Sequence, residues 1–114
     1  MIFGTHYRKI EDITSIVEHD LGVSLVRFDH PELGASYALV QKIDGIDEEI
    51  FEIASTIVYD DEEDRYESVN PAYEQYSYII DVNDNFPKIT NIFLKMIDSG
   101  RIEADPITGS VNPE

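Results

Sequence analysis

Apolar residues recur at helical spacing in two segments of this chain, and the stretches between those segments have the composition of β-strands. The first helical segment spans 9–21, and Gly22 follows it where a helix C-terminal cap is expected. The second spans 86–99, with Pro87 at a first helical position and Gly100 at its end. The pattern therefore predicts one helix near each end of the chain, with strands between them.

Four segments between the predicted helices are rich in β-branched and aromatic residues. VSLVRF at 23–28 and ASYALVQKI at 35–43 flank a turn that contains Pro and Gly, which predicts a β-hairpin. IDEEIFEIASTIVY at 46–59 fits a helix or a strand, and its β-branched end favours the strand. Asp44-Gly45 just before it is a hairpin turn signal. YEQYSYIIDV at 73–82 predicts a further strand.

These elements predict an α+β fold. We expect an antiparallel sheet of three or four strands with an N-terminal and a C-terminal helix packed on one face. A chain of 114 residues suits one small domain, which we assign to residues 1–100. Residues 101–114 contain two prolines and one glycine, and we predict that they form a loose C-terminal tail.

The formal net charge of -16 is concentrated in the middle of the chain. Residues 1–43 hold six acidic and four basic residues, residues 44–86 hold fourteen and one, and residues 87–114 hold four and three. This surplus argues against direct binding to nucleic acid or to an anionic membrane, because contacts with phosphate need cations. It favours a positively charged protein partner instead.

The sequence lacks the signals that mark several functional classes. We find no apolar run of the ~20 residues that cross a membrane, no secretory signal at the N-terminus, and no cysteine, which fits a reducing cytoplasm. We also find no nucleophile motif and no phosphate-binding glycine loop. The three histidines are spaced too far apart to share one face of an element. We therefore expect a cytoplasmic protein that is not an enzyme and that uses no cofactor and no metal.

One short motif points to calcium. The heptapeptide DVNDNFP, Asp81 to Pro87, resembles the Asp-x-Asn-Asp-Asn-x-Pro linker with which cadherin repeats hold calcium between successive domains. The resemblance implies Asp81, Asn83 and Asp84 as metal ligands and covers about ten residues. The chain departs from the all-β cadherin repeat elsewhere, because two segments have helical periodicity. Asn and Asp also form turns and helix caps, with Asp84 or Asn85 as the cap before Pro87.

The stretch YDDEEDRYESVNPAYEQY, 59–76, combines acidic residues with four tyrosines. Clustered acids repel one another and steer cationic partners, and tyrosine provides large rigid contacts at interfaces. We take the acids as the charge source and the tyrosines as anchors for a partner. The acidic candidates are Asp60, Asp61, Glu62, Glu63, Asp64 and Glu67, extended by Glu48, Glu49 and Glu52 if these face the same way, and the anchor candidates are Tyr59, Tyr66, Tyr73 and Tyr76.

The resulting hypothesis is a small acidic inhibitor that occludes a basic partner, such as a nuclease or another nucleic-acid-binding protein, by mimicking phosphates. An immunity protein against a nuclease toxin, or an anti-CRISPR or anti-restriction protein, would act in this way. The alternative is a structural or assembly subunit whose acidic face is merely solvated. A calcium-binding module that uses DVNDNFP is the third possibility.

Overall fold

The computed structural model of the protein describes residues 1–30, 34–60, 62–68 and 73–107, and it describes the backbone alone for His30, 57–60 and 65–68. Within these residues, neither helix is long and apolar enough to cross a membrane. The elements follow one another in the order β1 (Ile2–Thr5), α1 (Ile10–Leu21), β2 (Val26–His30), β3 (Gly34–Ile43), β4 (Ile46–Ser55), β5 (Ile57–Asp60), β6 (Arg65–Ser68), β7 (Tyr78–Val82), α2 (Pro87–Asp98) and β8 (Asp105–Pro106).

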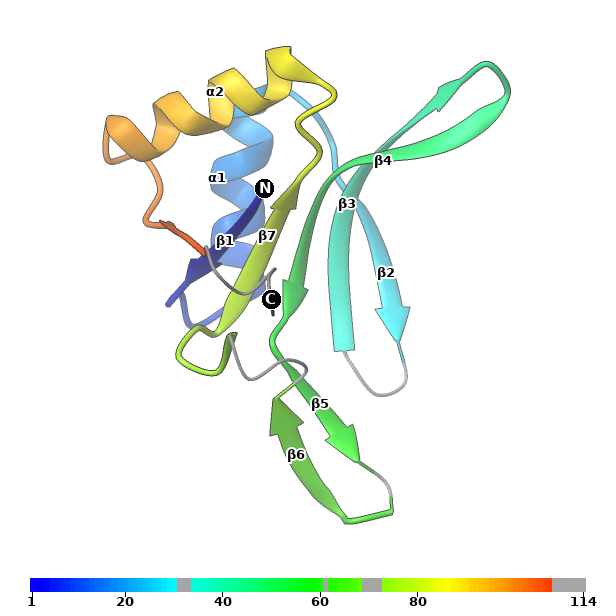
Figure 1. Ribbon diagram of the computed structural model, residues 1–114, viewed down its shortest axis with the longest axis vertical. Coiled ribbons are helices and arrows are strands. Elements are labelled where there is room, and N and C mark those ends of the chain that lie inside the picture. Colours follow the sequence, from blue (N-terminus) through cyan, green and yellow to red (C-terminus); the bar gives the residue numbers. More distant parts are fainter. Residues whose placement is uncertain (31–33, 61, 69–72, 108–114) are drawn as a thin grey trace, which may run out of the picture.

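A six-stranded antiparallel sheet forms the body of the fold, in the order β2-β3-β4-β7-β1-β8, and β5 pairs with β6 in a separate hairpin (Figure 1). The α+β prediction is confirmed, but the prediction of three or four strands is wrong. The placement of the helices also differs, since β1 precedes α1 and β8 follows α2. These flanking strands have four and two residues, too few for a periodic pattern to reveal them.

One face of the sheet forms the hydrophobic core together with both helices. Ile53 of β4 lies opposite Ile80 of β7, and Ile80 lies opposite Phe3 of β1. These side chains are buried, as is Phe51, which shares their face. From α2, the ring of Phe93 contacts the rings of Phe3 and Phe51 edge-on, with 5.2 Å between the ring centroids in each pair. This aromatic cluster joins α2 to the sheet.

Neither helix packs on the opposite face of the sheet, which we call the helix-free face (Figure 1). The pairing register places Val26, Ala38, Glu52, Asp81 and Ile2 in one row across five strands of this face. Glu52 and Asp81 therefore lie directly opposite each other on neighbouring strands. Like charges in this position repel each other.

Helix α1 covers the predicted range. Gly22 ends it in the left-handed conformation, with φ of 68°, and its N–H donates to the carbonyl oxygen of Glu18 at 3.0 Å. Helix α2 begins at Pro87, as predicted, but the expected side-chain cap is wrong. Phe86 occupies the N-cap position and no side chain caps the helix. The side-chain oxygen of Asn83 instead accepts the N–H of Asn85 at 3.0 Å, which fixes the turn before the helix.

The strand interpretation of 46–59 is confirmed by β4 and β5, and a β-bulge in β4 changes which residues face the core. Leu39 pairs with Phe51, and the next residue, Val40, pairs with Glu49, so Ile50 is left out of the register. Ile50 and Phe51 are consecutive residues of one strand, yet both are buried, with exposed fractions of 2% and 0%. The bulge turns both side chains inward, and the alternation of faces is reversed beyond it.

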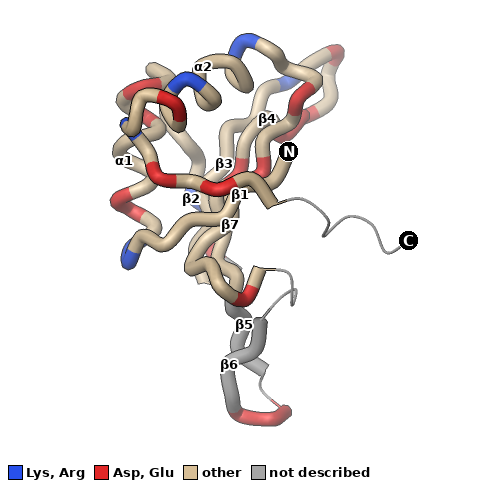
Figure 2. The backbone as a smooth tube through the Cα atoms, turned by 60° about the vertical axis from the view of Figure 1, so that its left-hand side comes forward, with Lys and Arg blue, Asp and Glu red and all other residues tan. Residues whose placement is uncertain are grey.

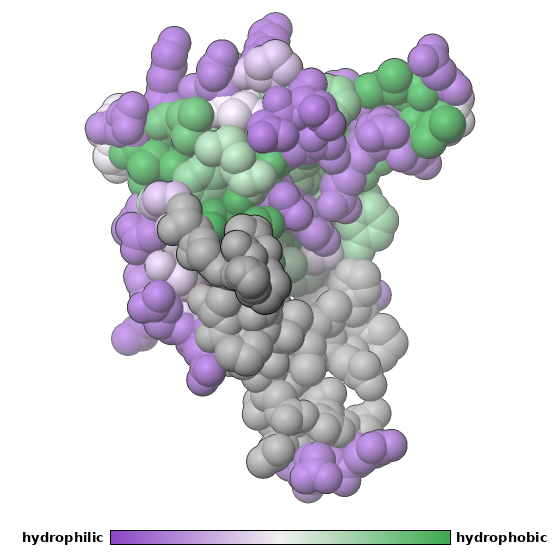
Figure 3. Space-filling view, in the orientation of Figure 1, coloured by the Kyte–Doolittle hydropathy of each residue, from purple (hydrophilic) through white to green (hydrophobic). Residues whose placement is uncertain are grey.

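Beyond the bulge, β3 and β4 continue past β7 as a two-stranded arm (Figure 1). The predicted turn at Asp44-Gly45 closes it, with φ of 53° and 80°, as a turn of the type I′ class requires. Ile43 and Ile46 pair across the strands at the tip and are 38% and 63% exposed, and apolar side chains are visible there in Figure 3.

Two predicted segments need correction near the C-terminus. The strand expected over 73–82 is present only as β7, because Tyr76 N–H donates to Tyr73 O at 2.9 Å and closes a tight turn before it. The loose tail expected from residue 101 is wrong up to residue 107. Ile102 and Ala104 are buried, and β8 pairs with β1. Residues 108–114 lie outside the described residues.

Candidate functional site

The first part of the predicted acidic stretch belongs to the β5–β6 hairpin, which projects away from the six-stranded sheet (Figure 1). A turn of three acidic residues, Glu62, Glu63 and Asp64, closes the hairpin, and all three are exposed. Figure 2 shows these acids at the far end of the molecule. We call this segment the acidic turn. The side chains of the other candidates in the hairpin lie outside the described residues: Tyr59, Asp60, Asp61, Tyr66 and Glu67.

The three acidic candidates of β4 do not share one face. Glu52 lies on the helix-free face, and the bulge places Glu49 on that face as well. Glu48 pairs with Gln41 one position further along, so it points to the other side. The condition that the three residues face the same way is therefore met by Glu49 and Glu52 and not by Glu48, and their part in an acidic partner surface stays a prediction. Strict alternation along a strand would place Glu48 and Glu52 on one face and Glu49 on the other, because only residues an even number of positions apart share a face.

Glu49 also lines a pocket of about 280 Å³ with the motif residues Asp81, Asn83 and Asp84. The N-terminal ammonium group of Met1 lies at the same pocket and donates to the carbonyl oxygen of Val82 at 2.9 Å. Partial burial, and secondarily the negative charge of Asp81, raise the pKa of Glu49 above its ordinary value. This end of the helix-free face therefore brings three carboxylates and the N-terminal ammonium group together around one recess.

The DVNDNFP motif is used for local structure at this pocket. The side-chain amide of Asn83 donates to the carbonyl oxygen of Glu49 at 3.2 Å, and its oxygen accepts from Asn85 N–H. Among the described residues, Asp81 and Asp84 are not part of any group of three His, Asp or Glu ligands that converge closely enough to hold a metal ion. The motif thus forms a turn that connects β7 to α2.

The two described tyrosine candidates differ in their surroundings. Tyr73 is half-buried in the turn before β7. Tyr76 lies over Gly4 of β1 so closely that a Cβ atom on Gly4 would overlap its ring. The ring of Tyr76 also packs against His6, with 5.1 Å between the ring centroids. Tyr76 therefore has a packing role in the fold that its spacing in the sequence does not indicate.

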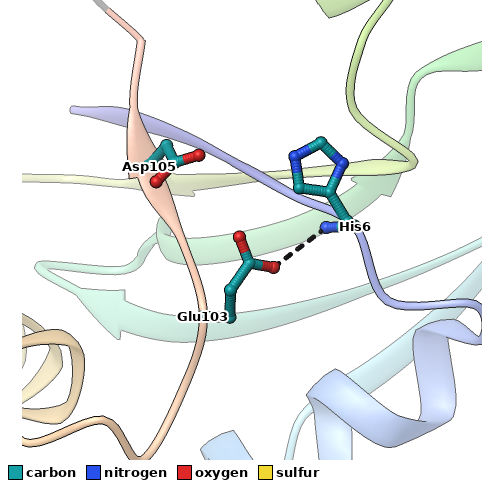
Figure 4. Close-up of side chains that lie close together, drawn as sticks. All are labelled: His6, Glu103 and Asp105. Carbon is teal, nitrogen blue, oxygen red and sulfur yellow. Dashed lines mark hydrogen bonds between the residues drawn. The ribbon is translucent and has the colours of Figure 1, made fainter.

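A cluster that the sequence reasoning missed lies beside Tyr76. His6, Glu103 and Asp105 each offer a ligand atom, and these atoms all lie within 4.8 Å of one another (Figure 4). The missed signal is the alternation in 102–105, where buried Ile102 and Ala104 interleave with exposed Glu103 and Asp105. Spacing between histidines does not reveal this cluster, because His6 and Glu103 are 97 residues apart in the sequence.

Three features therefore stand out in the described residues: the acidic turn, the acidic end of the helix-free face, and the cluster around His6. The basic residues Lys88 and Lys95 lie on α2, away from the acidic turn (Figure 2). Comparisons of the chain with protein-family models, curated proteins and solved structures gave no match.

Proposed function

We propose that this protein is a cytoplasmic inhibitor that binds a basic nuclease or another nucleic-acid-binding protein and occludes its nucleic-acid-binding surface. The observation that supports this proposal most directly is the β5–β6 hairpin, which carries the acidic turn away from the body of the fold (Figure 1). A narrow acidic projection of this kind fits a cationic groove that otherwise holds phosphates.

The arrangement of charge supports the same function. Isolated two-stranded hairpins are only marginally stable, and clustered acids reduce stability further. In the body of the fold, Glu52 and Asp81 lie opposite each other on β4 and β7 and add to the acidic character of the helix-free face. A cationic partner would be attracted by these acids over a long range.

A capture experiment with the wild-type chain is the first test of the proposal. The wild-type chain is immobilised, a cell lysate is passed over it at low salt, and the bound proteins are eluted with excess duplex DNA. We expect a basic protein to be released by the duplex, because the inhibitor and the DNA compete for one surface. Capture should weaken steeply as salt rises, since the Debye length is about 10 Å at 0.1 M. The eluted protein is then assayed for nuclease activity or DNA binding with and without the inhibitor.

Two triple variants separate the acidic turn from bulk charge. Glu62→Lys/Glu63→Lys/Asp64→Lys reverses the acidic turn. Glu11→Lys/Asp12→Lys/Asp98→Lys reverses three exposed acids on the two helices, with the same change in net charge. Loss of capture and inhibition in the first variant alone supports the proposal. Equal loss in both variants, or capture that duplex DNA does not reverse, contradicts it and favours the structural subunit with a solvated acidic face.

A further inference from the structure

The C-terminal segment brings two carboxylates beside a histidine from the start of the chain. Asp105 of β8 lies opposite Gly4 of β1 in the pairing register. Glu103 lies two residues before Asp105, and His6 lies two residues after Gly4, so the alternation of side chains along each extended segment puts all of them on one side. Figure 4 shows the three side chains directed toward a common space. Ile102 and Ala104 point the other way, into the core.

Neighbouring residues hold the cluster in place. The backbone N–H of His6 donates to one carboxylate oxygen of Glu103 at 3.2 Å, and the backbone N–H of Glu103 donates to the hydroxyl of Tyr7 at 3.0 Å. The ring of His6 packs on Tyr76, which Gly4 in turn positions. The backbone segments that carry His6 and Glu103 are therefore tied together, while the side chains themselves are exposed and can adjust. The hydrogen bond that the Glu103 carboxylate accepts is of the kind that orients ligating carboxylates in known sites.

The charge of the cluster favours a cation. Two carboxylates lie beside an imidazole, and within the described residues no lysine or arginine forms an ion pair with either carboxylate. The surrounding chain has a formal net charge of -16, which adds to the attraction. A divalent ion would neutralise both carboxylates without removing the hydrogen bond that joins His6 to Glu103.

We propose that His6, Glu103 and Asp105 form a binding site for a first-row divalent transition metal, with Zn²⁺ as the probe. One imidazole nitrogen and two carboxylate oxygens are ligands that zinc accepts, whereas calcium and magnesium prefer oxygen ligands alone. Each ligand atom would lie about 2 Å from the ion, so any two ligand atoms that are close to the 4.8 Å limit would have to approach each other by roughly an ångström. Three protein ligands leave a further coordination position for water.

The metal would fasten the C-terminal segment to the end of β1. Two residue pairs between β8 and β1, and the hydrogen bond from Ile107 N–H to the carbonyl oxygen of Ile2, join this segment to β1, and the metal would add a bridge from His6 to Glu103 and Asp105. Because the site forms only in the folded chain, zinc should stabilise the fold. This inference is independent of the proposed inhibitor function, since the acidic turn takes no part in it.

Zinc binding is measured on the full chain without a histidine tag, by calorimetry and by NMR of the histidine rings, in excess Mg²⁺ to saturate diffuse acidic sites. We expect one zinc site per chain, a shift of the His6 ring signals, and a rise in melting temperature. Glu103→Gln/Asp105→Asn should lower the affinity at least about tenfold, since even residues that merely support metal ligands contribute this much. His6→Ala should have the same effect.

The controls are matched in charge and residue type. Glu62→Gln/Asp64→Asn removes two carboxylates elsewhere, and His19→Ala removes an exposed histidine that contacts only one carboxylate, Asp20, among the described residues. Both controls should bind zinc as the wild type does. If Glu103→Gln/Asp105→Asn and Glu62→Gln/Asp64→Asn lose affinity equally, or if the His6 signals do not respond to zinc, the proposal is wrong. Circular dichroism of each variant verifies that it is folded.

Discussion

Gly4 allows the close approach of an aromatic ring to a central strand. Tyr76 lies against this residue from the helix-free face, and the same ring contacts His6. Any side chain at position 4 must displace the ring, although the backbone there is ordinary extended β1. The absence of a side chain is therefore required by packing and not by a turn.

We predict that Gly4→Ala lowers the free energy of unfolding by about 1–3 kcal/mol, the usual cost of inserting a group into a packed site. Urea unfolding at 25 °C measures the change. In a Tyr76→Ala background the overlap is gone, and Gly4→Ala should instead be neutral or stabilising by up to about 1 kcal/mol, because alanine is preferred to glycine in a strand. Equal losses in both backgrounds would show that the ring is not the cause.

At the scale of elements, the β-bulge decides which residues of β4 form the core. It turns Ile50 inward beside Phe51 and reverses the alternation for the arm beyond it. Ile46 and Ile50 have the same side chain, four residues apart on one strand. Ile50 is almost fully buried and Ile46 is largely exposed at the tip of the arm.

We predict that Ile50→Ala lowers the free energy of unfolding by about 2–5 kcal/mol, the range for truncating a buried isoleucine. Ile46→Ala should change it by no more than about 0.5 kcal/mol, as for most surface substitutions. Chemical unfolding of the two variants measures both values. Similar losses in the two variants would contradict the burial difference that the bulge creates.

The elements that the sequence predicted are those with local signals. Helix α1 has a full apolar stripe and a glycine cap, and the arm has an Asp-Gly turn between β-branched runs. Strands β1 and β8 are too short for a periodic pattern of their own and are defined by partners far away in the sequence. The bulge is likewise a property of the pairing of β3 with β4. The grouping of Glu49 with Glu52 could not be predicted without it.

The candidate sites also differ in whether a local sequence pattern reveals them. The acidic turn is contiguous in the sequence and was identified as a candidate directly, though its role as a partner surface stays a prediction. The cluster around His6 depends on the pairing of β1 with β8, which brings opposite ends of the chain together. Spacing among the histidines carries no signal for it. The resemblance of DVNDNFP to a calcium linker was local as well, and the structure uses Asn83 in a turn.

For the molecule as a whole, the position of each acid matters more than the total charge. Two carboxylates show this, because the fold lowers the pKa of one and raises the pKa of the other. Arg101 donates to both oxygens of Asp20, at 2.8 and 2.7 Å, and this pair, together with His19, holds the pKa of Asp20 well below its usual range. Burial and the charge of Asp81 raise the pKa of Glu49 instead. Ionised Asp20 therefore stabilises the fold, and ionised Glu49 opposes it.

We predict that Glu49→Gln raises the melting temperature at pH 7 and that Asp20→Asn lowers it, although each removes one negative charge. The gain from Glu49→Gln should vanish as the pH falls below the ordinary glutamate pKa of about 4.3, where the residue is protonated in both the folded and the unfolded states. The loss from Asp20→Asn should persist down to the ordinary aspartate pKa of about 3.9 and shrink only in stronger acid, because the folded state keeps Asp20 ionised. Melting curves recorded from pH 7 down to pH 2 measure both effects. If the two variants instead shift the melting temperature in the same direction at pH 7, net charge and not local placement would govern the stability of this acidic fold.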